Sequence, residues 1–165
     1  MKRRILIAVF AVVFLMGIIG VLNRTPSVSV GTVTVTNNGK DTDLDGYEVS
    51  QYRNGKKTQK NTGFDIKALA NKVKSFDQNV KKNNGSETVT VATDMAVGFS
   101  GRYCDDISYS VYDLDGKVIN NDETSLNLPT KNIDGCVVKV DVKWGRDKNY
   151  KEYYYFFRIN YKEVQ

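Results

Sequence analysis

The chain of 165 residues contains no histidine. This absence excludes serine–histidine–aspartate and cysteine–histidine catalysis, and it excludes metal sites built from imidazole ligands. No glycine-rich phosphate-binding loop is present either, and no other catalytic constellation is recognisable. The sequence therefore favours a non-catalytic protein.

Cysteine is also scarce, with Cys104 and Cys136 as the only two residues of this type. Outside the cytoplasm, an even number of cysteines favours a disulfide. Closing a loop of roughly 33 residues would stabilise the fold by about 3.7 kcal/mol in the chain-entropy treatment. We therefore expect a Cys104–Cys136 bridge, and two separate buried thiols are the alternative.

Little net charge remains once the N-terminal segment is set aside. The chain has 24 basic and 19 acidic residues, and four of the basic ones flank an N-terminal apolar run: Lys2, Arg3, Arg4 and Arg24. The remainder is close to neutral, which argues against nucleic-acid binding driven by bulk charge. The remaining charges are uneven, because residues 53–82 are mostly basic and residues 105–134 mostly acidic. A solvated surface explains this pattern, and a basic end facing anionic lipid or cell-wall polymer is the alternative.

The apolar run covers residues 5–22 and reads ILIAVFAVVFLMGIIGVL. As a helix it would be roughly 27 Å long, close to the thickness of a hydrocarbon core. A cleaved signal peptide usually has a shorter apolar stretch of ~7–15 residues, with small residues before the cut site. We therefore predict an uncleaved transmembrane signal anchor, and secretion after cleavage is the alternative.

The basic residues before this run determine the predicted topology. By the positive-inside rule, residues 1–4 form a cytoplasmic tail and the C-terminal part lies outside the cytoplasm. Residues 23–27 then form a linker, and residues 28–165 form one extracytoplasmic domain. The sequence thus predicts a single-pass protein of the cell membrane.

Beyond the linker, the pattern predicts a mainly β domain. Apolar and polar residues alternate through residues 136–144 and 150–162, which indicates two long strands. This ending, DGCVVKVDVKWGRDKNYKEYYYFFRINY, resembles the final hairpin of immunoglobulin-like modules of bacterial surface proteins, and the resemblance extends over residues 86–162. It implies an antiparallel immunoglobulin-like β-sandwich with a binding or spacer role.

One amphipathic helix is expected over residues 64–82. Apolar residues recur there at steps of three and four, namely Ile66, Leu69, Val73, Phe76 and Val80. Packing of this face against the sheet is expected, and a helix lying on the membrane surface is the alternative.

Two further motifs are candidate binding sites. Asp41, Asp43 and Asp45, followed by Gly46, are similar to the DxDxDG runs of EF-hand, dockerin and thrombospondin-type calcium loops, which implies bound calcium. Tyr52 stands where those loops place a bidentate glutamate, so an acidic hairpin turn is favoured over a calcium site.

The second candidate is an aromatic contact patch on the last strand. Tyr154, Phe156 and Arg158 share the strand face opposite the expected core, and exposed aromatics beside arginine suit a partner or a carbohydrate. Coverage of these residues by helix 64–82 or the first hairpin is favoured over an exposed patch.

These features predict a non-catalytic, membrane-tethered binding or scaffolding module of a bacterial envelope. Its partner would be an envelope protein or a cell-wall polymer. One alternative is a calcium-stabilised adhesion module. Another is a wall-glycan hydrolase or accessory domain, which would need Asp105 or Asp106 to face another acid across a groove.

Overall fold

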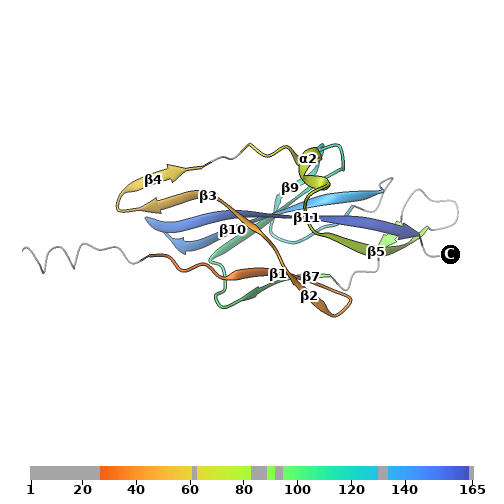
Figure 1. The fold of residues 1–165 in the computed structure, drawn as a ribbon, viewed down its shortest axis with the longest axis horizontal. Coiled ribbons are helices and arrows are strands. Elements are labelled where there is room, and N and C mark those ends of the chain that lie inside the picture. Colours follow the sequence, from red (N-terminus) through yellow and green to blue (C-terminus); the bar gives the residue numbers. More distant parts are fainter. Residues whose placement is uncertain (1–26, 61–62, 83–88, 92–94, 130–133, 164–165) are drawn as a thin grey trace, which may run out of the picture.

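Strands dominate the computed structural model, which describes residues 27–60, 63–82, 89–91, 95–129 and 134–163 (Figure 1). The prediction of a mainly β domain is confirmed. Among these residues, no helix combines the length and the apolar character needed to cross a membrane. The predicted tail, the anchor at residues 5–22 and nearly all of the linker lie outside the described residues.

Two sheets make up the body of the molecule. The small sheet is antiparallel, with the order β2–β1–β7: β1 (Thr32–Asn37), β2 (Lys40–Asp43) and β7 (Ala96–Ser100). The large sheet has the order β4–β3–β11–β10–β8–β9: β3 (Gly46–Arg53), β4 (Lys56–Gln59), β8 (Asp106–Tyr112), β9 (Val118–Glu123), β10 (Gly135–Arg146) and β11 (Asn149–Glu163).

The β10–β11 hairpin forms the centre of the large sheet. Its strands have 12 and 15 residues, and they pair along the whole length of β10. The first part of β11 pairs with β3, whereas its last part pairs in parallel with β5 (Ser75–Lys82), which also pairs with β6 (Val89–Val91). The alternation that predicted these two strands is therefore observed.

The main core lies between the two sheets. Val138, Val140 and Val142 of β10 are fully buried on its inner face. Side chains of β1 and β7 pack against them, and the Phe99 ring meets the Trp144 ring edge-on at 5.9 Å. Burial of this kind stabilises the fold by about 1.5–3 kcal/mol per large side chain, so this interior is the main source of stability.

The predicted helix over residues 64–82 is wrong for most of its length. Helix α2 covers only Ile66–Ala70, and the side chain of Asp65 caps it by accepting a hydrogen bond from the Ala68 N–H at 3.0 Å. The chain then extends into β5, where Phe76, Gln78 and Val80 are all buried on one face. A four-residue spacing fits a strand face as well as a helix face, so Phe76 and Val80 gave an ambiguous signal.

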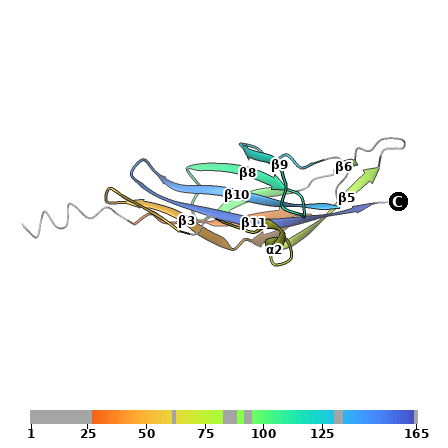
Figure 2. The same ribbon diagram turned by 90° about the horizontal axis from the view of Figure 1, so that it is seen from above.

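The chain enters the body at one end of its long axis. The described chain begins beside the β3–β4 hairpin tip and the β10–β11 turn, whereas β5 and the end of β11 lie at the opposite end (Figures 1 and 2). The basic residues of segment 53–82 do not gather at one end. Lys56 and Lys57 lie at the first hairpin, whereas Lys72 and Lys74 follow α2, away from that tip.

Candidate functional sites

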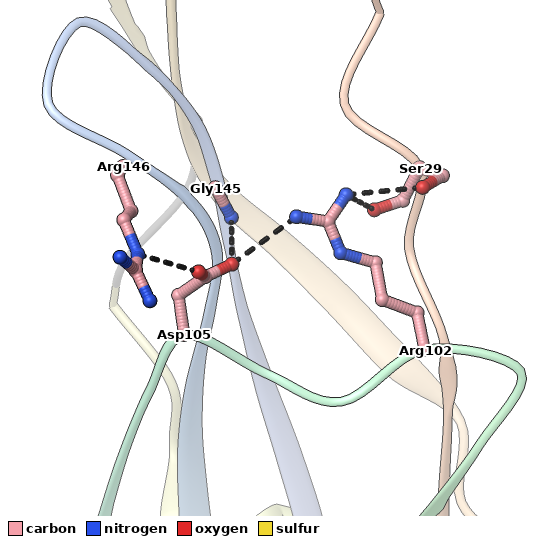
Figure 3. A network of polar contacts seen from close by, with 5 residues as sticks. All are labelled: Ser29, Arg102, Asp105, Gly145 and Arg146. Carbon is pink, nitrogen blue, oxygen red and sulfur yellow. Dashed lines mark hydrogen bonds and ion pairs between the residues drawn. The ribbon is translucent and has the colours of Figure 1, made fainter.

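The carboxylate of Asp105, just before β8, lies at the centre of a network of polar contacts (Figure 3). Its Oδ2 accepts hydrogen bonds from the Gly145 N–H at 2.7 Å and from Arg102 Nη2 at 3.2 Å. Its Oδ1 accepts from Arg146 Nε at 2.9 Å. The side chain is only 17% exposed. This carboxylate therefore joins the loop after β7 to the end of β10.

Arg102 extends the same network to residues 27–31, which lead into β1 and are called the entry segment below. Its Nη1 donates to both the carbonyl oxygen and the Oγ of Ser29, at 3.2 and 3.0 Å (Figure 3). Close packing accompanies these bonds, because a Cβ added at Gly31 would lie 2.3 Å from the Arg102 carbonyl oxygen. Only glycine permits that approach, so the entry segment is fastened by hydrogen bonds and by shape.

The charge of Asp105 is stabilised by its donors. The Gly145 N–H and the Arg146 side chain hold the pKa of this carboxyl below its usual range, and the charge of Arg102 adds to the effect. An ionised acid held by three donors of the protein is suited to fastening rather than to proton transfer. The sequence singled out Asp105 only as a hydrolase candidate. It gave no signal for Ser29, Arg102 or Arg146, because contacts between distant segments leave no local pattern.

The predicted contact patch at Tyr154, Phe156 and Arg158 is covered. Phe156 is 3% exposed, and the Phe64 ring lies 5.1 Å from its ring. Tyr154 is half-buried beneath the same Phe64, at 5.8 Å. Arg158 Nη1 is 3.5 Å from the carbonyl oxygen of Ala70. Segment 64–73, including α2, thus packs on this face, as the favoured interpretation of the sequence expected, although the covering helix is short.

The predicted disulfide between Cys104 and Cys136 is wrong for this fold. Both residues are free thiols. The N–H of Asp105, next to Cys104, donates to the carbonyl oxygen of Lys143, whereas Cys136 lies seven residues earlier on β10. That stretch of strand spans about 23 Å, and a disulfide needs Cα atoms within about 7 Å. The alternative, two separate thiols, describes this structure.

The three aspartates of the predicted calcium loop do not converge. Asp41 and Asp43 lie on the extended strand β2, where side chains on one face are about 7 Å apart. Asp41 Oδ1 accepts a hydrogen bond from Thr36 Oγ1 at 2.6 Å, and the main-chain carbonyl of Asp43 accepts from Lys74 Nζ. Within the described ranges, no three acidic or cysteine side chains are grouped so that they could hold a metal ion. The geometry therefore gives no support to calcium bound by Asp41, Asp43 and Asp45.

A small acidic hollow on the outer face of the large sheet was not predicted. Asp106, Asp141 and Glu152 line it together with Ile107, Ser108 and Lys143, and its volume is about 110 Å³. Burial, followed by the charge of Glu152, raises the pKa of Asp141 to about 7. Glu152 Oε2 accepts a hydrogen bond from Ser50 Oγ at 2.5 Å.

This hollow brings Asp106 close to other acids, as the hydrolase alternative requires, but its size argues against that activity. Two carboxyls with separated pKa values are typical of glycoside hydrolases. Sites for small molecules usually have about 300–1,000 Å³, however. A hollow of about 110 Å³ is too small to enclose a sugar unit of a wall glycan.

Comparisons with family models, with curated proteins and with solved structures gave no match to this chain. The functional argument therefore rests on the chain itself. Two features of the chain are distinctive. One is the fastening of the entry segment through Asp105, and the other is the set of basic residues at the nearby ends of the β3–β4 and β10–β11 hairpins.

Proposed function

We propose that this chain is a non-catalytic, membrane-tethered module of a bacterial envelope, which binds or scaffolds other envelope components. The signal anchor at residues 5–22, the cytoplasmic tail at residues 1–4 and the immunoglobulin-like resemblance all enter this proposal from the sequence. The observation that carries it is the bonding of Ser29 to Arg102, and through Arg102 to Asp105.

The position of that contact supports a short connection between the proposed anchor and the body. Ser29 is two residues beyond the proposed linker at residues 23–27. Since Ser29 is held to the loop after β7, and that loop to β10, only residues 23–28 separate the body from the proposed anchor. A short connection keeps the body close to the membrane, and this confinement raises its effective concentration toward its neighbours.

The internal structure also favours presentation over catalysis. Apolar side chains fill the space between the two sheets, and the acidic hollow is small. An envelope protein or a cell-wall polymer is the proposed partner of the body.

Extraction of cell membranes at alkaline pH tests the tether directly. The full-length chain should stay in the membrane pellet, because an apolar span resists extraction. Introducing Val13→Arg and Met16→Arg should release it, since each arginine at the centre of a span costs about 2.5–3.5 kcal/mol. The matched variant Ser27→Arg should stay in the pellet. Release of the unmodified chain, or a mature protein that begins beyond Leu22, would refute the proposal.

A further inference from the structure

The body carries a cluster of positive charge at the end where the described chain begins (Figures 1 and 2). Two hairpins end there, β3–β4 and β10–β11, and the basic residues at their ends are exposed. We name these residues the basic hairpin tips: Arg53, Lys56, Lys57, Arg146 and Lys148. Asp147 is the acid within the two turns, and Arg146 remains 82% exposed although it pairs with Asp105.

The two tips are held side by side. The antiparallel pairing of β3 with β11 places Tyr52 opposite Tyr150. Their rings stack at 5.9 Å with an interplanar angle of 20°, and the ammonium of Lys143 lies 4.6 Å from the centre of the Tyr150 ring. These contacts make the tips one surface rather than two independent loops.

A polar hollow opens within the first tip. It has a volume of about 380 Å³, and all five lining residues are basic or neutral and can donate hydrogen bonds: Gln51, Arg53, Asn54, Lys56 and Thr58. Guanidinium, ammonium and amide donors around an open hollow suit a phosphate group.

The entry segment brings this surface close to the proposed anchor. Val28 packs against the β10–β11 turn, because a Cβ added at Gly145 would lie 3.2 Å from its Cγ2. From Leu22 to Ser29 the chain reaches at most roughly 25 Å when fully extended. A body fastened at Ser29 can therefore bring its tips to the headgroup layer, within the roughly 8 Å over which surface charge acts at physiological salt.

We infer that the basic hairpin tips are a contact surface for the phosphates of anionic lipid headgroups. This inference rests on the proposed membrane anchor, since the anchor sets the distance. Lipid is favoured over an anionic wall polymer, because the tips lie at the end from which the chain enters the body rather than at the opposite end. Contact there would orient the body and leave β5 and the far end of β11 pointing away from the membrane.

Lysine acetylation of the full-length chain in vesicles, followed by mass spectrometry, tests the inference. Zwitterionic vesicles are compared with vesicles that contain roughly 30% phosphatidylglycerol. Acetylation of Lys56, Lys57 and Lys148 should slow by about fivefold on the anionic vesicles, and high salt should reverse the effect. Three exposed lysines away from the tips serve as internal controls and should change by less than about twofold: Lys40, Lys72 and Lys117.

The outcomes separate this inference from the proposed tether. Retention of the chain on zwitterionic vesicles at alkaline pH reports the anchor alone. Equal acetylation rates at the tips on both vesicle types would overturn the inference and leave the anchor standing. Protection of the tips by soluble polyphosphate but not by anionic vesicles would also overturn it, in favour of a wall polymer. As a matched pair, Lys56→Gln/Lys57→Gln should weaken the salt-sensitive contact, whereas Lys72→Gln/Lys117→Gln should not.

Discussion

Asp105 shows how one side chain can fix the attachment of a whole domain. Its carboxylate accepts from a backbone N–H and from two arginines, and one of those arginines holds the entry segment. Because the donors come from segments far apart in the sequence, loss of this carboxylate should loosen several connections at once.

Replacing Asp105 by asparagine should therefore destabilise the protein in a pH-dependent way. The pKa of Asp105 is lowered in the folded state, so its contribution is present above the unfolded pKa and is lost as pH falls through the folded pKa. We expect Asp105→Asn to cost about 1–3 kcal/mol at pH 7 in urea titrations, with the difference shrinking below about pH 4. Asp147→Asn, an exposed change in the neighbouring turn, is the control. Equal midpoints at pH 7 for Asp105→Asn and wild type would contradict this role.

The pH dependence of the stability contributed by Asp141 has the opposite sign to that of Asp105. Its folded pKa is raised to about 7 by burial and by Glu152, so between about pH 4 and pH 7 the native state holds a proton that the unfolded state has lost. Stability from this residue therefore falls as pH rises through that window. Asp141→Asn should stabilise the protein at pH 8, and the gain should disappear near pH 4. A pH-independent effect of Asp141→Asn would refute the assignment.

The cysteines provide a third test at this scale. Burial raises the pKa of Cys136 to about 11 and also raises that of Cys104, which is half-buried. In the folded protein, a thiol reagent should modify Cys104 faster than Cys136, and Cys104→Ser should remove the faster phase. Denaturation without reductant should expose two reactive thiols. Finding none would restore the disulfide and contradict the strand register described above.

At the scale of elements, the long strands could be predicted from the sequence and segment 64–82 could not. Val138, Val140 and Val142 alternate with polar residues, and that period belongs to strands alone. Phe76 and Val80 fit either period, and the polar Gln78 between them concealed the alternation. Burial of Gln78 is tolerated because its amide donates to Asn37 Oδ1 at 2.5 Å. No local sequence pattern indicates that partner.

The candidate sites were less predictable than the strands for a related reason. A face of β11 can be assigned from alternation, which placed Tyr154, Phe156 and Arg158 together. What covers that face depends on where segment 64–73 folds back, and what surrounds Asp105 depends on Ser29, Arg102 and β10. Such contacts follow from the tertiary arrangement and not from spacing in the sequence.

The covering of β11 by α2 and its flanks should contribute measurably to stability. Phe156→Ala should cost about 3–5 kcal/mol, because the side chain is 3% exposed and packs against the Phe64 ring. In a double-mutant cycle, Phe64→Ala and Phe156→Ala should couple by about 0.5–1.5 kcal/mol. Tyr103→Ala is the control, because that ring is 82% exposed and its loss should change stability by less than about 0.5 kcal/mol. A cost for Phe156→Ala as small as that for Tyr103→Ala would show that the face is open.

At the scale of the whole molecule, the proposed function requires the body to have one orientation relative to the membrane. The entry segment, the Asp105 network and the basic hairpin tips all lie at one end (Figures 1 and 3). The proposed function depends on that end facing the membrane and on the rest of the body lying outside the cytoplasm.

Protease treatment of wall-stripped, intact cells tests this central claim most directly. With a tag at the C-terminus, an external protease should remove the tag while a cytoplasmic marker protein stays whole, because the body is predicted to lie outside. A tag that survives until the cells are lysed would contradict the account.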